Sequence, residues 1–364
     1  MVEVVNEGQQ YVGLAAMYTK NLIDGNNIFG IEMRSATLRG YLDAVNDLFR
    51  EKKCTLPIDF DQPKTNPSAI FYEQIKTWEK EPNRRTHMTP EFLHELLTRA
   101  NAESDQDSFV PVVRDWTAMA RYAAFRMCEV GQKNQKDIGY HTVPVTNKRI
   151  MKAFARGDFE FFDKIGQRIT DVQNNAHRIH TIRITWRVQK NRRNGQQITW
   201  EIDLANPAIC IVKAAIRIYL RSIRYDPEGK LPLGFYIEKG TIRYLTGRKV
   251  STLFKTIAVH VYPDITPAEL KQYSAHMWRV TACVLLQHAG KNEDYIKIRL
   301  RWAGEAYKLY LRNTAILARQ HLAAVSTQKG LFTDAYTLQP SAMPTDPIER
   351  VAHVDTAMGS YESF

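Results

Sequence analysis

The sequence lacks several features that define large classes of protein. No apolar run reaches the roughly 18 residues that a membrane-spanning helix needs, so no span is expected. The four cysteines lie far apart without a C-x-x-C pair, which argues against zinc ligation and favours buried thiols in a reducing compartment. The chain shows no internal repeat, low-complexity tract or glycine-rich phosphate loop. Its acidic, polar N-terminus lacks the pattern of a signal peptide, so we expect an intracellular protein.

The composition is that of a basic globular protein. Of the 364 residues, 44% are hydrophobic and 24% are charged, which is typical of folded chains and allows two domains with separate cores. The net charge is +11 and the isoelectric point is about 9.4. Such an excess of Lys and Arg fits a polyanionic partner, although a soluble basic protein without one has the same balance.

The first hundred residues show helical periodicity. Leu38, Leu42 and Val45 fall on one face of a helix that begins near residue 37. Similar patterns predict helices over 9–23, 68–80 and 90–103. The stretch N-A-E-S-D-Q-D-S at residues 101–108 is polar and acidic. We interpret it as a linker between two domains, although a long loop inside one domain has the same composition.

The rest of the chain mixes helices with one hairpin. Ile182, Ile184 and Trp186 alternate with polar residues, and the alternation resumes at Ile198 after a turn that contains Gly195. Two alternating runs around such a turn predict a β-hairpin. Helices are predicted over 110–127, 207–223, 249–260, 267–273, 275–289, 292–300 and 304–324, with a short strand at 234–238.

These patterns together indicate a mainly α (α+β) protein in three parts. Residues 1–104 form a helical N-terminal domain. Residues 109–326 form a mostly helical domain with a small antiparallel sheet. The tail over 327–364 is richer in Pro, Thr, Ser and Asp, and we expect it to be extended or disordered.

The segment from residue 273 to residue 313 carries the most chemical information. It contains, in order, His276, Arg279, Trp302, Tyr307 and Tyr310. His276 and Arg279 are three apart, so on a helix they share a face and can point at one anion, such as a phosphodiester. A tyrosine hydroxyl near such a site can act as a nucleophile. The grouping therefore suggests transfer of a phosphoryl group to tyrosine.

The motifs Y-S-A-H-M-W-R-V-T-A-C and Y-L-R-N stand in the same order as in the catalytic half of tyrosine recombinases, the family of Cre, Xer and phage integrases, which the chain resembles over about residues 110–325. The resemblance implies a DNA recombinase or integrase, of the kind that mobile elements encode, that breaks and rejoins strands through a 3′-phosphotyrosyl intermediate. It implies double-stranded DNA as the partner, a homotetramer on DNA, and neither metal nor cofactor. It also implies a DNA-associated location, in the nucleus of a eukaryote or in the cytoplasm or nucleoid of a bacterium.

The family's other positions carry over residue by residue. The sequence F-R-M-C-E-V places Arg126 at the first family arginine and Glu129 in a supporting role, although a surface ion pair has the same spacing. Lys190, near the hairpin turn, corresponds to the lysine that protonates the leaving 5′ oxygen. The neighbouring Arg192 and Arg193 suit contacts to DNA phosphates. Phosphate contacts are also expected from four arginines of the helical half: Arg34, Arg39, Arg84 and Arg85.

The last two positions are an aromatic residue and the nucleophile. Trp302 matches the family's alternative to histidine. Tyr310 lies eight residues later, one short of the usual spacing, and the following L-R-N favours it as the nucleophile. Tyr307 shares its helical face and remains the alternative.

Two other functions fit the same motifs. A degenerate recombinase that only binds DNA is disfavoured by the complete series of catalytic residue types. A type IB topoisomerase uses similar residues, but the long linker region of that family is absent from this sequence.

Overall fold

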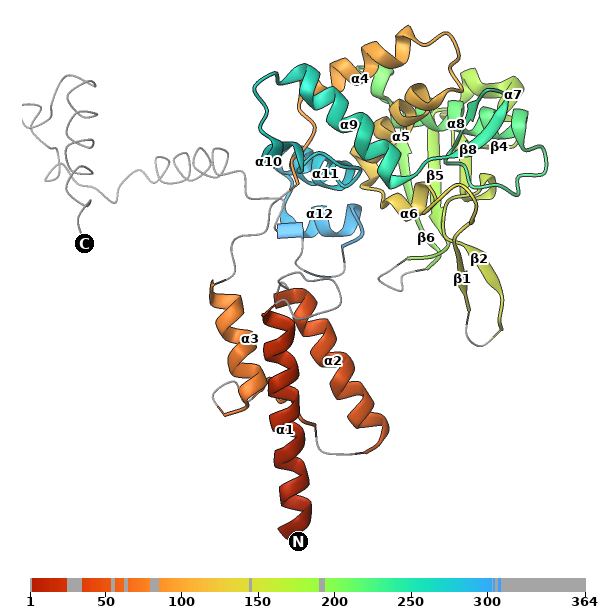
Figure 1. Cartoon of the computed structure of the whole chain (residues 1–364). Coiled ribbons are helices and arrows are strands. Elements are labelled where there is room, and N and C mark those ends of the chain that lie inside the picture. The colour runs from red at the N-terminus through yellow and green to blue at the C-terminus, as the bar shows by residue number, and fades with distance from the viewer. Residues whose placement is uncertain are drawn as a thin grey trace, which may run out of the picture. The chain divides into compact units, whose positions relative to one another are not determined.

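The computed structural model describes residues 2–24, 35–53, 56–61, 65–78, 85–143, 146–189, 194–302, 304 and 307–308. The chain divides between Arg84 and Arg85 into two compact units (Figure 1). Each unit is described by itself. None of the helices in these ranges is long and apolar enough to span a membrane.

The described residues of the first unit form three helices, α1 (Val2–Ile23), α2 (Ser35–Glu51) and α3 (Pro67–Trp78). Their apolar faces enclose a small core that contains Ala15, Leu22, Leu38, Leu42 and Ile58. The side chain of Asn46 fixes the loop before α3, because its amide both donates to and accepts from the backbone of Ile58. The three helices predicted from periodicity in residues 9–80 are confirmed.

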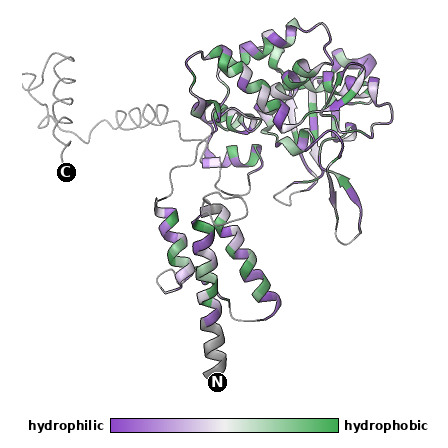
Figure 2. Ribbon diagram, in the orientation of Figure 1, coloured by the Kyte–Doolittle hydropathy of each residue, from purple (hydrophilic) through white to green (hydrophobic). Residues whose placement is uncertain are grey.

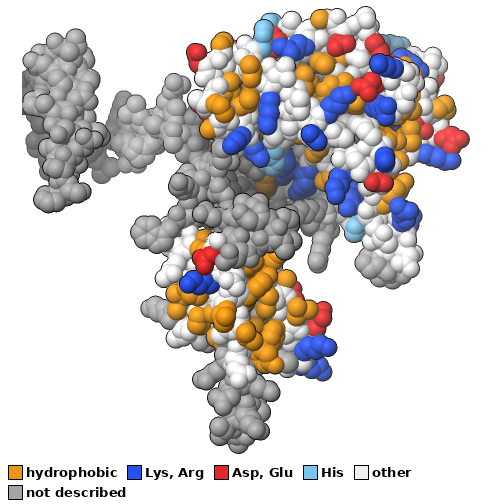
Figure 3. Space-filling model, viewed as in Figure 1, with side chains coloured by type: hydrophobic (Ala, Val, Ile, Leu, Met, Phe, Trp, Pro, Cys, Tyr) orange, Lys and Arg blue, Asp and Glu red, His pale blue; other side chains and the backbone are white. Residues whose placement is uncertain are grey.

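One face of this unit is apolar and exposed. On α1, the side chains of Leu14 and Met17 are 61% and 65% exposed, and Tyr11 and Tyr18 lie on the same side of the helix. Figure 3 shows hydrophobic side chains gathered on the visible face of this unit, and Figure 2 shows hydrophobic and hydrophilic residues alternating along α2.

The second unit combines helices with short strands. Its helices are α4 (Pro90–Ala102), α5 (Phe109–Ala123), α6 (Met127–Val130), α7 (Val172–Asn175), α8 (Ile211–Tyr225), α9 (Gly247–Val261), α10 (Pro267–Leu270), α11 (Met277–His288) and α12 (Glu293–Arg299). Short 3-10 turns are η1 (Arg156–Asp158), η2 (Ala176–Arg178) and η3 (Pro207–Ile209). The predicted mainly α fold with a small antiparallel sheet is confirmed.

The strands form three antiparallel sheets. They are β1 (Tyr140–Thr142), β2 (Arg149–Met151), β3 (Phe159–Phe162), β4 (Arg168–Ile169), β5 (Thr181–Trp186), β6 (Gln196–Glu201), β7 (Phe235–Glu238) and β8 (Thr241–Tyr244). One sheet has the order β4-β3-β5-β6, and the other two are the pairs β1-β2 and β7-β8. In the predicted hairpin, Ile182 pairs with Trp200 and Ile184 with Ile198, which puts the apolar alternate residues on one face.

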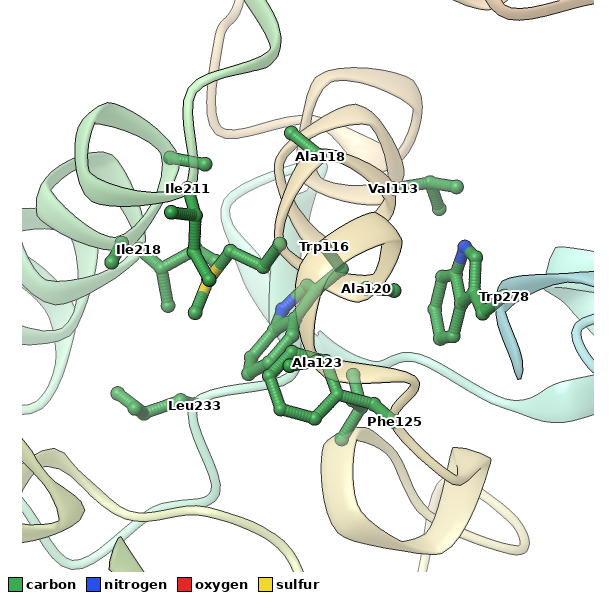
Figure 4. Packing of buried hydrophobic residues seen from close by; sticks show 14 of the residues in the cluster. Val113, Trp116, Ala118, Ala120, Ala123, Phe125, Ile211, Ile218, Leu233 and Trp278 are labelled. Atoms are coloured by element: carbon green, nitrogen blue, oxygen red, sulfur yellow. The ribbon is translucent and has the colours of Figure 1, made fainter. Parts of the chain in front are cut away.

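Helix α5 runs through the middle of the second unit. Figure 4 shows Trp116 and Ala123 of this helix packed near Phe125, with Trp278 of α11 on another side. The ring centres of Trp116 and Phe125 are 5.6 Å apart, and both side chains are buried. The indole of Trp278 donates to the hydroxyl of Thr117 over 2.9 Å. Helix α11 is therefore anchored to α5 by packing and by a buried hydrogen bond.

A buried ion network ties α5 to α8. The carboxylate of Asp115 is fully buried and accepts from Arg217 over 2.8 Å and from Arg221 over 3.2 Å. Arg221 also donates to Asp107 over 3.1 Å. The charges are partnered, as buried charges must be.

The division of the chain differs from the expected linker at residues 101–108. Helix α4 belongs to the second unit, where Phe92 and Leu96 are fully buried in the main core. The acidic residues of the expected linker have partners there, since Asp107 binds Arg221 and its carbonyl accepts from the backbone of Ile237. The stretch connects α4 to α5 within one unit, and its polarity reflects ion pairing and turns.

Candidate active site

The site is built around a break in the helix expected over 110–127. Helix α5 ends at Ala123 because Ala124 adopts the left-handed conformation, with φ of 48°. The last carbonyls of a helix have no partner inside it and carry partial negative charge. Two arginines from distant segments satisfy them: Arg301 donates to the Ala123 carbonyl over 3.0 Å, and Arg279 to the Ala124 carbonyl over 2.8 Å. The break thus gathers two cations at one point.

Arg126 and Glu129 follow the break. Arg126 precedes the short helix α6 in an extended conformation, so the two residues do not share a continuous helix as expected. The Glu129 carboxylate accepts from the Arg126 backbone N–H and from its guanidinium, both over 2.9 Å. The Glu129 side chain is 4% exposed and that of Arg126 is 22% exposed. The pair is therefore half-buried, with its cation toward the surface.

His276 and Arg279 stand at the start of α11. The buried Arg279 guanidinium carbon lies 4.0 Å from the centre of the Trp302 ring. Burial, with a smaller effect from the nearby Arg126, lowers the pKa of Arg279 to about 10. At neutral pH the guanidinium still carries its charge.

The imidazole of His276 is held neutral. Burial, together with the charges of Arg279 and Arg85, lowers its pKa to about 4. A neutral imidazole at pH 7 can donate one N–H to an incoming oxygen and still has an acceptor nitrogen. Arg85 was expected to act with the helical N-terminal half, but it belongs to the second unit, where its charge acts on His276.

A pocket joins four of the predicted catalytic residues. It has a volume of about 490 Å³ and is lined by Phe125, Arg126, Met127, Cys128, Ala275, His276, Arg279 and Trp302. Three of these residues carry groups that donate hydrogen bonds to anions, and one wall is the aromatic ring of Trp302. The pocket can therefore receive a phosphate-sized anion beside an aromatic surface.

Arg301 is a site residue that the sequence did not reveal. Its side chain is fully buried and donates to both oxygens of Glu129, each over 3.3 Å. Its guanidinium carbon also lies 3.8 Å from the centre of the Trp186 ring. The charges of Arg301 and Arg126 outweigh burial and hold the pKa of Glu129 below its usual value. The only sequence signal was its position directly before Trp302, which carries no chemistry by itself.

The structure describes one of the two candidate tyrosines. Tyr307 is buried in a small cluster with Cys283 and Leu300, and its hydroxyl donates to Glu293 over 2.9 Å. Its ring centre lies 6.4 Å from that of the pocket residue Trp302, while its partner Glu293 is not among the residues that line the pocket. Tyr310 lies outside the described residues.

Several other predicted residues cannot be compared with the site. Lys190, Arg192, Arg193, Arg34 and Arg84 also lie outside the described residues. Arg39 lies in the first unit, where it pairs with Asp43 over 3.0 Å and covers the ring of Phe60. Across the described ranges, no three His, Cys, Asp or Glu side chains cluster in a way that can hold a metal ion.

Comparisons with known proteins give structural neighbours alone. No family model and no curated protein matches the sequence. The chain is similar to the Tn1549 transposon integrase in complex with circular intermediate DNA, with 13% identity, a TM-score of 0.46, and 86% of each chain covered. It is also similar to XerA recombinase, with 11% identity, a TM-score of 0.39, and 89% of this chain and 92% of that chain covered. TM-scores below 0.5 do not establish a common fold.

Proposed function

We propose that the protein is a tyrosine recombinase that breaks and rejoins double-stranded DNA through a 3′-phosphotyrosyl intermediate. The observation that carries the proposal is the meeting of Arg126, His276 and Arg279 in one pocket, although the first lies far from the others in the sequence. Three donors directed at one anion-sized space suit a phosphoryl group whose charge grows in the transition state.

The chemistry is assigned to the residues as follows. The Tyr310 oxygen attacks the phosphorus as its proton passes to the acceptor nitrogen of the neutral His276 imidazole, the bond to the 5′ oxygen breaks, and Lys190 gives that oxygen its proton. Arg126, Arg279 and His276 bind the non-bridging oxygens, while Trp302 holds Arg279 in place. The ester stores the energy of the broken bond, so a 5′ hydroxyl can attack it and rejoin the strands without a nucleotide cofactor.

Buried guanidinium groups supply the positive charge in this scheme. Metal ions supply this charge in many phosphoryl-transfer enzymes. Here Arg279 is nearly completely buried and held by the Ala124 carbonyl, so its charge is preorganised and poorly screened by water. We therefore propose that the reaction needs no metal, and that it will proceed unchanged in EDTA.

We assign DNA binding to both units. The net positive charge of the chain and the arginines at 34, 39, 84 and 85 support phosphate contacts from the first unit and from the segment that follows it. We propose that four copies assemble on two DNA duplexes; the tail over 327–364 is outside the described residues. DNA affinity should fall steeply with salt, because phosphate contacts release counterions.

The proposal is tested with the genomic DNA that flanks the gene for this chain. Short duplexes that tile this DNA, each with a nick close to the scissile phosphate, trap a covalent intermediate because the released fragment diffuses away. An adduct that resists SDS and is removed by protease supports strand cleavage by the protein. DNA that is shifted in a native gel but never trapped covalently supports a protein that only binds DNA.

A further inference from the structure

Helix α12 ends in a turn that has an unusual residue at its left-handed position. The N–H of Arg301 donates to the Ile298 carbonyl over 3.3 Å, and that of Trp302 to the Lys297 carbonyl over 2.9 Å. These two bonds define a Schellman turn, whose left-handed position is normally filled by glycine. Here that position is Arg301, with φ of 61°. A side chain in this conformation is retained only where its surroundings hold it firmly.

The side chain of Arg301 is held by three kinds of contact. It donates to both oxygens of Glu129 and to the Ala123 carbonyl, and its guanidinium stacks on Trp186. It is fully buried, so it cannot itself touch DNA. Its partner Glu129 is the group that fixes Arg126, through both the backbone N–H and the guanidinium. The chain of contacts therefore runs from Arg301 through Glu129 to Arg126.

We infer that Arg301 is a positioning residue that locks Glu129, and through it Arg126, in the geometry that binds the reacting phosphate. The same residue sets the turn that delivers Trp302 onto Arg279. One side chain thus connects both arginines of the pocket. The inference deepens the proposed function and rests on it for the identity of the phosphate.

The charge balance explains why a second arginine is needed behind the pocket. Glu129 is buried, and an isolated buried carboxylate takes up a proton to escape the cost of desolvation. Arg301 opposes this, so Glu129 stays ionised and accepts from Arg126 at the same time. Without Arg301, the carboxylate has a single guanidinium partner, and Arg126 loses a fixed anchor.

The test uses two substitutions of Arg301 and one matched control. Arg301→Gly restores the residue normally found in the turn, so it relieves the backbone while it removes the guanidinium. Arg301→Lys keeps the charge but cannot donate to two oxygens and a carbonyl in the same way. Arg299→Ala is the control, because Arg299 also belongs to α12 and stacks on a tryptophan, Trp200, yet contacts neither Glu129 nor the pocket lining.

Two measurements are made on each folded variant. The first is titration of the Glu129 carboxyl by carbon-13 NMR, with the signal assigned from Glu129→Gln. The second is the single-turnover rate of covalent adduct formation on the nicked duplex, with DNA affinity measured in parallel. We expect Arg301→Gly and Arg301→Lys to raise the pKa of Glu129 and to slow adduct formation by about tenfold to a hundredfold, the range seen when the outer partners of metal ligands are removed. DNA affinity and all properties of Arg299→Ala should stay near wild type.

Added guanidinium chloride gives a further test, because it should leave the cleavage rate unchanged if Arg301 has a purely structural role. At low millimolar concentration it should partly restore the rate of Arg301→Gly, whereas equal sodium chloride should not. The inference is overturned if both variants keep the wild-type Glu129 titration, or if they shift it without slowing cleavage. If the wild type forms no adduct, the proposed function fails. The Glu129 titration still tests whether Arg301 holds this carboxylate: a raised pKa in the variants supports that role, and an unchanged pKa contradicts it.

Discussion

Arg279 lies over the ring of Trp302, with its guanidinium carbon 4.0 Å from the centre of the ring. The arginine comes from α11 and the tryptophan from the turn after α12, so this contact joins the two segments that carry the resemblance to recombinases. A cation over an aromatic face gains about 0.5–2 kcal/mol, more when water is excluded. The arrangement gives Trp302 a role as the surface on which Arg279 is oriented.

Substitutions of Trp302 test whether its aromatic face orients Arg279. Trp302→Phe keeps an aromatic face for Arg279, and we expect adduct formation within about tenfold of wild type from the cation–π range. Trp302→Ala removes the face and should be slower than Trp302→Phe. Single-turnover cleavage of the nicked duplex measures both rates. Equal rates for the two variants would show that the ring face does not orient Arg279.

Substitution of Arg279 tests the preorganised donor. Arg279→Lys keeps one positive charge but loses the planar group that stacks on Trp302 and donates to Ala124. Removing a preorganised donor commonly lowers the rate by about 10²–10³, and Arg279→Ala should abolish measurable cleavage. DNA binding should remain, because phosphate contacts elsewhere supply most of the affinity. Normal cleavage by Arg279→Ala would mean that the site is wrongly assigned.

The neutral state of His276 predicts a specific loss of stability in acid. Its pKa is about 4 in the folded protein and about 6.5 in an unfolded chain. Between these values the unfolded state binds more protons, so the free energy of unfolding falls as pH falls from about 6.5 to about 4. This group has no effect above that window.

The measurement compares melting temperatures of wild type and His276→Gln at pH 7 and pH 5. The glutamine variant cannot take up a proton, so it should lose less stability between the two pH values. Arg85→Gln should raise the pKa of His276, as followed by proton NMR of the imidazole, because one repelling charge is removed. The same melting shift in wild type and His276→Gln would contradict the assignment.

The buried network between α5 and α8 predicts a large effect on stability without an effect on chemistry. Asp115→Asn leaves Arg217 and Arg221 without their shared carboxylate in the core. Breaking a buried pair in this way costs about 3–5 kcal/mol of unfolding free energy, measured by urea denaturation. Glu228→Gln, which breaks an exposed pair with Lys230, should cost about 1 kcal/mol or less. The folded Asp115→Asn protein should keep its cleavage rate.

Periodicity in the sequence predicted most of the regular structure. Helices α1 to α4, α8 and α9 and the hairpin β5–β6 each bury one apolar face, which a single sequence displays. Helices α5 and α11 are buried on most sides, and their apolar-rich runs predicted them. The short strands β1 to β4 and β8 were missed because two to four residues are too few to show an alternation. The boundary at Arg84 was also missed, because the acidic stretch at 101–108 has the composition of a linker while Asp107 is bound in the fold.

The site was predictable only where local spacing determines it. His276 and Arg279 come together because one segment carries both. The left-handed turns at Ala124 and Arg301 were not predictable, because both residues are ones that rarely adopt positive φ. These two turns place the α5 carbonyls, Glu129 and Arg301 together, and such packing between distant segments leaves no local pattern.

The nucleophile gives the most direct test of the account. Tyr307→Phe loses the bond to Glu293 and should cost about 0.5–1.5 kcal/mol of stability while still trapping nicked DNA. Tyr310→Phe removes the proposed attacking oxygen and should fold and bind DNA normally. The decisive measurement is an SDS gel of wild type and both variants with a nicked, labelled duplex that the wild type cleaves. The account predicts a covalent band for wild type and Tyr307→Phe and none for Tyr310→Phe; a band from Tyr310→Phe would contradict it.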